Sequence, residues 1–369
     1  MLAQYASFTC PHHVYSDQSD QSSAYPIYMA ENETRLDRLV ALLPHGYAAR
    51  AAAPERDALP LSQLINEMRA DVGDPLRDSP ADVHDNIAGG EVNTALDTVV
   101  IEGTGGVLAG YAVAYPVLDG AKPRVFLFGA TRPSVHGQGI GSALIAWTMD
   151  RAHERLQQFP DGTIQAQCGE GEARTQRLYQ SVGMRPIRWF HDLELRFAKR
   201  ETGSEPERFT LPTGYTAEPF SSADPEAIRL LHNACFADHW GSSGMTPTVW
   251  HEEFLAHEGA RPAYGEIVRD ERGDAIAYQL TTEFPQDLAT TGRMLWIDKL
   301  GVLAQHRGRG IGTTLIERHL ARARRDGYEG VMLGVDTASL TGANKLYERI
   351  GFTPRYGGVR YILGDANFS

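Results

Sequence analysis

Apolar and polar positions follow two different periods along this chain of 369 residues. Apolar residues that recur every three or four positions predict helices, and short apolar runs between turn signals predict strands. In the second half of the chain the pattern predicts helices over 227–237 and 311–325 and strands over 264–269, 275–284, 294–302 and 331–335. The first half shows the same order, with helices over 61–69 and 140–157 and strands over 98–102, 107–117, 124–131 and 163–167. Such mixing of helices and strands indicates an α/β fold.

Three pairs of matching segments show that the chain contains an internal repeat. VHGQGIGSALI around Gly139 matches HRGRGIGTTLI around Gly310, at an offset of 171 residues. RLYQSVGM around Tyr179 matches KLYERIGF around Tyr347, at an offset of 168 residues. HGYAARAAAP and TGYTAEPFSS form a third pair, also at an offset of 168 residues. A repeat that keeps its order and spacing predicts two copies of one domain in tandem.

The two copies divide the chain into four expected parts. The N-terminus is polar and aperiodic, which predicts a flexible arm, and a stretch rich in charge, glycine and proline between the copies predicts a linker. The expected bounds are 1–34 for the arm, 35–198 for the first domain, 199–212 for the linker and 213–369 for the second domain.

Charge and cysteine content narrow the classes of function. Asp and Glu outnumber Lys and Arg by 47 to 35, which gives a formal net charge of −12. Such a field repels nucleic acid and anionic membranes and favours cationic small molecules. The sequence shows no long apolar run and no secretory signal, and its three cysteines are too scattered for a disulfide framework or a zinc motif. We therefore expect a cytoplasmic monomer or homodimer that binds no nucleic acid, membrane or metal.

The strongest chemical signal is a glycine-rich segment between the strand over 294–302 and the helix over 311–325. It reads Arg307-Gly308-Arg309-Gly310-Ile311-Gly312-Thr313. Glycine lets backbone N–H groups turn toward an anion, and the start of a helix adds partial positive charge. The spacing fits neither the dinucleotide-binding GxGxxG motif nor a P-loop. The segment predicts a phosphate site, and the alternative is a tight turn between strand and helix.

At these residues the chain resembles the GNAT acetyltransferase superfamily. In that family a segment R/Q-x-x-G-x-G/A, here Arg307 to Gly312, binds the pyrophosphate of acetyl-CoA. The resemblance extends to NKLYERIGF, starting at Asn344, which is similar to the family's closing helix and strand. It covers roughly residues 45–198 and 213–363 and implies two tandem GNAT-like domains, each a mixed, mostly antiparallel sheet flanked by helices. The tandem layout is similar to that of mycothiol synthase.

The resemblance implies acetyl-CoA as the cosubstrate and gives several residues a role in binding it. The loop from Arg307 to Thr313 would hold the pyrophosphate. Backbone groups of Leu300 and Val302 would hold the pantetheine arm, and a strand N–H would polarise the thioester carbonyl. Asn344 would cap the closing helix or touch acetyl-CoA.

Acetyl transfer to an amine needs a neutral amine and a proton for the departing thiolate. Asp298 lies on the strand before the loop, where alternation places it on the same face as Trp296 and Leu300. A half-buried carboxylate is costly without a role or a partner, so we assign Asp298 as the general base; the alternative is an ion pair with Lys299 or an arginine. From its place in the family pattern, Tyr347 would be the acid, and the alternative is a core tyrosine.

The two copies carry different residues at these positions. Alignment of the loops places Leu127 opposite Asp298, His136 opposite Arg307 and Gln138 opposite Arg309. The first copy therefore lacks the carboxylate and both cations, and an arginine–phosphate hydrogen bond contributes about 1.5–3 kcal/mol. We expect the second domain to be the catalyst and the first to be a degenerate copy.

The acceptor stays open, because specificity in such a fold lies in variable loops. We expect a primary amine of a small molecule, with Asp238, His239, Glu283 and Asp287 as candidates for orienting it. Asp238 or His239 could instead serve as the base, and the alternative for this segment is a helix-ending turn with Trp240 in the core. One alternative is a mycothiol-synthase-like acetylation of a cysteinyl amine, although Trp296 stands where that enzyme's proposed carboxylate lies. The other is a non-catalytic module that binds acetyl-CoA.

Overall fold

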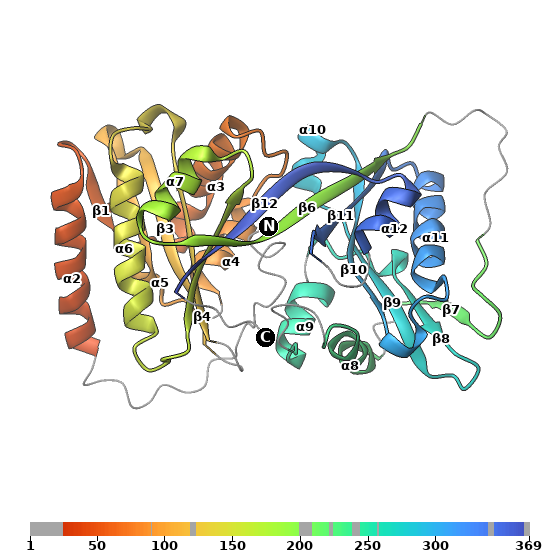
Figure 1. Cartoon of the computed structure of the whole chain (residues 1–369). Coiled ribbons are helices and arrows are strands. Elements are labelled where there is room, and N and C mark those ends of the chain that lie inside the picture. The colour runs from red at the N-terminus through yellow and green to blue at the C-terminus, as the bar shows by residue number, and fades with distance from the viewer. Residues whose placement is uncertain are drawn as a thin grey trace. The chain divides into compact units, whose positions relative to one another are not determined.

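The computed structural model describes residues 25–89, 91–118, 123–198, 209–220, 224–237, 244–256, 258–338 and 343–364. Contacts divide the chain into two compact units, which we call the N-terminal unit (Met1–Arg188 with Gly358–Ser369) and the C-terminal unit (Trp189–Gly357). Each unit is a twisted sheet with helices against it (Figure 1). Among the described residues, no helix has the length and apolar character needed to span a membrane.

The N-terminal unit contains most of the first half of the chain. Its helices are α2 (Tyr25–Leu42), α3 (Pro54–Asp71), α4 (Pro80–Ala88), α5 (Thr94–Asp97), α6 (Ile140–Arg155) and α7 (Ala173–Ser181). Its strands are β1 (Ala48–Arg50), β2 (Thr98–Glu102), β3 (Leu108–Val117), β4 (Arg124–Thr131) and β5 (Thr163–Gly169).

The C-terminal unit repeats this order. Its helices are α8 (Pro225–Cys235), α9 (Pro247–Trp250), α10 (Leu288–Thr291), α11 (Ile311–Arg325) and α12 (Ala343–Ile350). The remaining strands of the chain are β6 (Arg185–Arg196), β7 (Thr216–Pro219), β8 (Glu266–Arg269), β9 (Ala275–Thr282), β10 (Met294–Val302), β11 (Gly330–Asp336) and β12 (Thr353–Leu363).

The sheets of the two units have corresponding strand orders. The order is β1-β2-β3-β4-β5-β12 in the N-terminal unit and β7-β8-β9-β10-β11-β6 in the C-terminal unit. The pairs β4–β5 and β10–β11 are parallel, and the other described pairs within each unit are antiparallel. The expected fold class, two α/β copies with mixed, mostly antiparallel sheets, is confirmed.

Helices bury both faces of each sheet. In the N-terminal unit α3 and α4 pack on one face and α2 and α6 on the other. In the C-terminal unit α8 and α9 cover one face, and α11 and α12 cover the opposite face (Figure 1). We call these the α8 face and the α11 face of the C-terminal sheet. The apolar periodicity of the helices explains this layering, because each helix buries one stripe against the sheet.

The last strand of each sheet comes from the other copy of the repeat. Residues Phe190–Arg196 of β6 pair with β11, which places them in the C-terminal unit. Residues Gly358–Leu363 of β12 pair with β5, which returns the end of the chain to the N-terminal unit. There Val359 and Tyr361 join the buried cluster formed with α6 and α7. The two copies have therefore exchanged their final strands.

The structural units differ from the domain bounds expected from the sequence in two places. Helix α2 begins at Tyr25, inside the expected arm, and Arg35 on it forms a buried ion pair with Glu154 of α6. The chain passes to the C-terminal unit at Trp189, within β6 and before the expected linker. Tertiary pairing decides both positions, and neither has a local signal. Residues 1–24 and 199–208 lie outside the described residues, so the arm and the linker there stay predictions.

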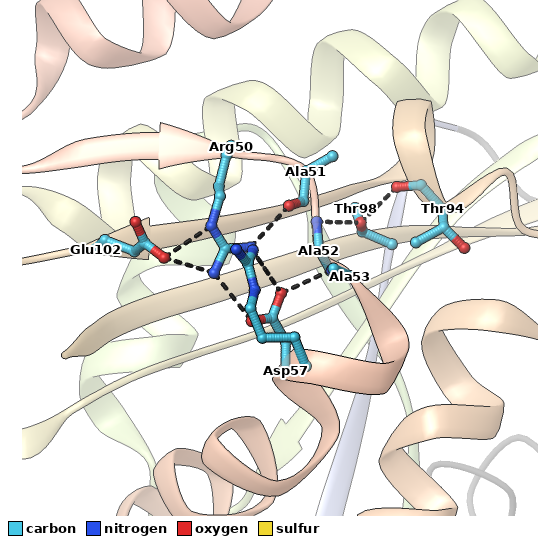
Figure 2. A network of polar contacts seen from close by, with 9 residues as sticks. Arg50, Ala51, Ala52, Ala53, Asp57, Thr94, Thr98 and Glu102 are labelled. Carbon is cyan, nitrogen blue, oxygen red and sulfur yellow. Dashed lines mark hydrogen bonds and ion pairs between the residues drawn. The ribbon is translucent and has the colours of Figure 1, made fainter. Parts of the chain in front are cut away.

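A polar network fixes the start of α3 against β1 and β2 (Figure 2). The Asp57 carboxylate accepts hydrogen bonds from the Arg50 guanidinium at 2.6 and 2.9 Å and from the Ala53 N–H at 2.7 Å. Arg50 also donates to Glu102 on β2 at 2.7 Å. Burial raises the pKa of Asp57, but these hydrogen bonds outweigh it and hold the pKa below its ordinary value. The network therefore holds the start of α3 in place against strands β1 and β2 of the N-terminal unit.

Candidate active site

Strands β10 and β11 separate halfway along their length. Met294–Ile297 pair in parallel with Gly330–Leu333, after which β11 continues beside β6 as far as Asp336. From Lys299 to Val302, β10 pairs with β9 alone among the described strands. The other edge of β10 therefore presents backbone N–H and C=O groups to any extended ligand that lies along it. This free edge leads directly into the glycine-rich loop.

A β-bulge stands where the strands separate. Ile297 lies opposite Thr281 and Lys299 opposite Leu280, so Asp298 is an extra residue with no partner on β9. Its carboxylate accepts a hydrogen bond from the Thr282 hydroxyl at 3.1 Å and forms an ion pair with the Lys299 ammonium at 3.0 Å. The bulge thus aims a carboxylate away from the ladder at the start of the free edge.

The bulge changes which residues share a face. Lys299, which pairs with Asp298, lies 5.2 Å from the centre of the Phe254 ring, on the α8 face. Trp296 lies opposite Thr282 and belongs to this face, as expected. Leu300 packs instead with the apolar residues of α11. The expectation that Asp298 and Leu300 share a face is wrong, because an inserted residue interrupts the strict alternation on which it rested.

The bulge also corrects the alignment of the two copies. In the N-terminal unit, β4 pairs with β3 without a shift, and its pairing with β5 ends at Leu127. In the C-terminal unit the corresponding pairing ends at Ile297. Leu127 is therefore equivalent to Ile297 and not to Asp298. The candidate base is an insertion in the C-terminal copy with no counterpart in the N-terminal one.

His232 and Tyr278 are two further polar residues near Asp298 and Lys299, and the sequence analysis gave neither of them a role. The imidazole Nδ1 of His232 on α8 lies 2.5 Å from the Tyr278 hydroxyl on β9. The His232 ring stacks on Phe236 with centroids 4.8 Å apart. Burial, together with the nearby charge of Lys299, lowers the pKa of His232 to about 3, so its imidazole is neutral at neutral pH. In the sequence these two residues could be noticed only as polar side chains among apolar ones, His232 on a predicted helix and Tyr278 on a predicted strand.

The glycine-rich loop has the geometry of an anion cradle. Gly308 and Gly310 have φ angles of 75° and 84°, and α11 begins at Ile311 without a side-chain cap. Within the described chain, the backbone N–H groups of residues 308–313 donate to no backbone carbonyl. A Cβ added at Gly308 would meet no atom within 4 Å. Free donors around open space at a helix start fit a phosphate group.

The two arginines of the loop have different surroundings. Arg307 donates to the carbonyl of Val302 at 3.0 Å and to the carbonyl of Cys235 at 2.8 Å, which ties the end of β10 to the end of α8. Arg309 is exposed and donates to the Tyr215 hydroxyl at 2.9 Å. The expected contact of both arginines with phosphate stays a prediction, and the geometry favours Arg309 for it.

The closing helix carries the candidate acid. Tyr347 packs on the α11 face with its ring centre 6.0 Å from that of Phe352. Burial raises the pKa of Tyr347 to about 12, so the phenol remains protonated at neutral pH. Asn344 donates to the carbonyls of Asp336 and Thr337 at 3.2 and 2.9 Å, which joins the end of β11 to α12. These bonds give Asn344 a structural role at the helix start.

Of the four residues expected to orient the acceptor, the two that the structure describes, Glu283 and Asp287, form no hydrogen bond or ion pair with Asp298. Glu283 accepts hydrogen bonds from Arg261 at 2.9 Å and from the Tyr328 hydroxyl at 3.0 Å. Asp287 is buried at the start of α10. Asp238 and His239 lie outside the described residues. Within the described part of the chain, no group of three or more His, Cys, Asp or Glu side chains can hold a metal ion.

The sequence model of the acetyltransferase (GNAT) family matches residues 62–184 and 226–352, one match in each copy of the repeat. These matches cover more than half of the chain. The chain belongs to the GNAT acetyltransferase family. GNAT enzymes transfer acyl groups from acyl-CoA, and the loop and free edge fit such a ligand. The family match also confirms that the chain is an N-acetyltransferase enzyme.

Several known proteins are similar to this chain over most of its length, and one of them is itself described as a tandem GNAT protein. A mycothiol acetyltransferase from Thermobispora bispora is 28% identical over 60% of this chain and 70% of its own length. The crystal structure of a GCN5-related N-acetyltransferase from Sphaerobacter thermophilus has a TM-score of 0.67 and 23% identity, over 89% of this chain and all of that one. A tandem GNAT protein from the clavulanic acid biosynthesis pathway has a TM-score of 0.62 and 16% identity, over 87% of this chain and all of that one.

Proposed function

We propose that the C-terminal unit transfers acetyl from acetyl-CoA to a primary amine of a small molecule. The observation that carries this proposal is the bulged carboxylate of Asp298 at the head of the free edge of β10. In this proposal the N–H groups of residues 308–313, with Arg309, hold the pyrophosphate. Backbone groups of Leu300 and Val302 then hold the pantetheine arm, which ends beside the bulge.

Asp298 and Tyr347 divide the proton transfers in this proposal. Asp298 accepts a proton from the attacking amine, and Tyr347 donates one to the sulfur that leaves. A backbone N–H on the free edge of β10 polarises the thioester carbonyl. The contacts of Asp298 lie on the α8 face, and Tyr347 packs on the α11 face. Base and acid on opposite faces support direct attack, because the amine and the sulfur then occupy different sides of the reacting carbon.

The N-terminal unit is a degenerate copy in this proposal. It has no residue equivalent to Asp298, because β4 has no bulge. At its loop, His136 contacts Arg174, and Gln138 accepts a hydrogen bond from the Tyr47 hydroxyl at 3.0 Å. His136 and Gln138 themselves carry no fixed positive charge, whereas the matching positions of the C-terminal loop are Arg307 and Arg309. We further propose that the enzyme is cytoplasmic, a monomer or homodimer, and needs no metal.

Thiol release from acetyl-CoA tests the proposal. Purified protein is assayed with aminoglycosides, amino-sugar cysteine conjugates, polyamines and free amino acids, beside Asp298→Asn as the matched control. We expect release with one class of amine and a loss of about 100-fold or more in the variant. Unchanged release in Asp298→Asn removes the base assignment, and silence across the panel with intact acetyl-CoA binding favours a non-catalytic sensor.

A mycothiol-synthase-like step is the second candidate. Its support is the name of the relative from Thermobispora bispora, a mycothiol acetyltransferase 28% identical to this chain over 60% of its residues. The acceptor would then be a cysteinyl amine on an amino sugar. In the same assay, release with an amino-sugar cysteine conjugate alone would identify this acceptor, whereas release with other amines alone would exclude it.

A further inference from the structure

Lysine is scarce in this chain, and one lysine lies beside the candidate base. The four lysines are Lys122, Lys199, Lys299 and Lys345, against 31 arginines. The Nζ of Lys299 lies 3.0 Å from Oδ1 of Asp298. An amine that Asp298 deprotonates must donate to one of its two oxygens; Oδ2 already accepts the Thr282 hydroxyl, and the Lys299 ammonium is at Oδ1. Lys299 is thus an amine of the chain itself that already lies at the candidate base.

The surroundings of Lys299 keep its amine in that position. Its side chain is 11% exposed, and its Nζ lies 5.2 Å from the centre of the Phe254 ring. The aromatic ring attracts the ammonium, and the carboxylate orients it. Because Lys299 follows the bulge directly, its backbone also belongs to the start of the free edge of β10.

We propose that Lys299 is a self-acetylation site, at which the enzyme acetylates its own chain when no acceptor is bound. The inference rests on the proposed function, since it uses the same base and the same acetyl donor. Acetylation removes the positive charge of Lys299 and its ion pair with Asp298. The modified side chain then fills the acceptor position with a neutral amide, so self-acetylation inactivates the enzyme.

The step balances without any further reactant. The Lys299 ammonium loses a proton to Asp298, and its nitrogen forms a bond to the acetyl carbon of acetyl-CoA. The carbon–sulfur bond breaks, and Tyr347 gives a proton to the sulfur. The second proton lost by the nitrogen passes to solvent, and from there Tyr347 regains its own. The products are an N-acetyl lysine in the chain, a free thiol and one proton.

Mass spectrometry of the full-length protein tests the inference. The protein is incubated with acetyl-CoA and no acceptor, and acetyl groups are located by peptide mapping over time. Lys345 is the internal control, because it is exposed on α12 and reports acetylation by simple chemical encounter. We expect Lys299 to be acetylated at least tenfold faster than Lys345. Acetylation of Lys345 with Lys299 unmodified would overturn the inference.

Two comparisons distinguish self-acetylation from chemical reaction. Asp298→Asn should slow acetylation of Lys299 by a factor of about 100 and leave that of Lys345 unchanged. A tenfold dilution of the unaltered protein, at constant acetyl-CoA, should leave the half-time at Lys299 unchanged, because the reaction is intramolecular. A half-time that lengthens tenfold on dilution would contradict the inference, even if the variant fails to fold.

The same samples separate this inference from the proposed function. An acceptor that supports thiol release should suppress acetylation of Lys299, because both amines compete for Asp298. Thiol release with an acceptor, but no acetyl group on Lys299 in its absence, overturns the self-acetylation alone. If neither thiol release nor acetylation of Lys299 is detected under any condition, both the proposed function and the self-acetylation are overturned.

Discussion

At the scale of single residues, both copies carry a tyrosine at the same position, Tyr179 and Tyr347, but the surroundings of the two hydroxyls differ. Tyr179 donates to the carbonyl of Gln167 at 3.1 Å and packs against Tyr361 with ring centres 5.4 Å apart. Tyr347 packs against Phe352, and among the described residues its hydroxyl has no hydrogen-bond partner. Both rings serve the core, but only the Tyr347 hydroxyl remains available to a ligand.

Removing the two hydroxyls should therefore have different effects. We expect Tyr347→Phe to slow thiol release by about 10²–10⁴-fold, the usual contribution of a general acid. Tyr179→Phe should lower the free energy of unfolding by about 1 kcal/mol, for one lost hydrogen bond, and leave the rate unchanged. Thiol-release kinetics and urea unfolding measure the two effects. A parental rate in Tyr347→Phe would remove its role as the acid.

Two buried histidines make the stability of the protein depend on pH. Burial lowers the pKa of both His232 and His319 to about 3, helped by the charges of Lys299 and Arg322 respectively. Between a pH of about 6.5 and 3, the unfolded chain binds a proton at each histidine and the folded chain does not. Stability is therefore lost as the pH falls below about 6.5, by about 1.4 kcal/mol per pH unit for each histidine.

We expect the free energy of unfolding to fall by about 4 kcal/mol between pH 7 and pH 5 from these two groups together. His319→Leu should remove about 2 kcal/mol of that fall, because leucine does not titrate. Urea unfolding of both proteins at the two pH values gives the comparison, in which any packing defect of the variant cancels. An equal fall in parent and variant would show that His319 binds its proton as readily in the folded state.

At the scale of elements, the two copies share the same strand pairing, while the charges of one ion pair at matching positions are reversed. Arg50 on β1 pairs with Glu102 on β2, and at the equivalent positions Glu218 on β7 pairs with Arg269 on β8, at 2.8 Å. The strand registers place these pairs in equivalent positions. The glycine-rich loops likewise keep their positive φ angles while their flanking side chains differ. Backbone geometry is therefore common to both copies, and side chains separate their roles.

The two loops supply a matched pair of glycine variants. Gly137 and Gly308 have φ angles of 81° and 75°, and a Cβ at either would meet no atom within 4 Å. We expect Gly137→Ala and Gly308→Ala to lower the free energy of unfolding by a similar amount, about 1 kcal/mol each. Only Gly308→Ala should raise KM for acetyl-CoA, by about tenfold, because its methyl group enters the space assigned to the pyrophosphate. An equal rise in Gly137→Ala would contradict the assignment of acetyl-CoA binding to the C-terminal loop alone.

At the scale of the whole molecule, each unit is completed by a strand from the other copy of the repeat. Tyr361 is 2% exposed in the N-terminal unit, although it lies near the end of the sequence. Leu193 is 6% exposed in the C-terminal unit, although it belongs to the first copy of the repeat. The stability of each unit therefore depends on pairing between two strands that lie far apart in the sequence.

Hydrogen exchange should show this dependence directly. Tyr361→Ala should cost about 3–5 kcal/mol and speed amide exchange in β5, which it flanks in the N-terminal unit. Leu193→Ala is the reciprocal control, with an expected cost of about 2–5 kcal/mol and faster exchange in β11. Faster exchange confined to the half of the chain that carries each substitution would contradict the exchange of strands.

Local pattern predicted many of the elements well. The expected spans 98–102, 124–131, 294–302 and 311–325 agree with β2, β4, β10 and α11. Each has strong periodicity and a glycine or charged boundary, which are properties of neighbouring residues. The pattern missed the short strands β1 and β7, and it missed α4, because a few residues carry too little periodicity. The position of the glycine-rich loop between strand and helix followed from the sequence for the same local reason.

The sequence by itself determined that the chain holds two α/β copies, that each has a glycine-rich turn between a strand and a helix, and that the second loop carries the richer set of charges. These properties depend on composition, spacing and turn chemistry within a few residues. The tertiary structure alone decided that Asp298 is a bulged insertion, that the Thr282 hydroxyl binds its carboxylate, and that the final strands are exchanged. Strand register and side-chain contacts across a sheet join residues far apart in the chain, and no local pattern encodes which of them will meet.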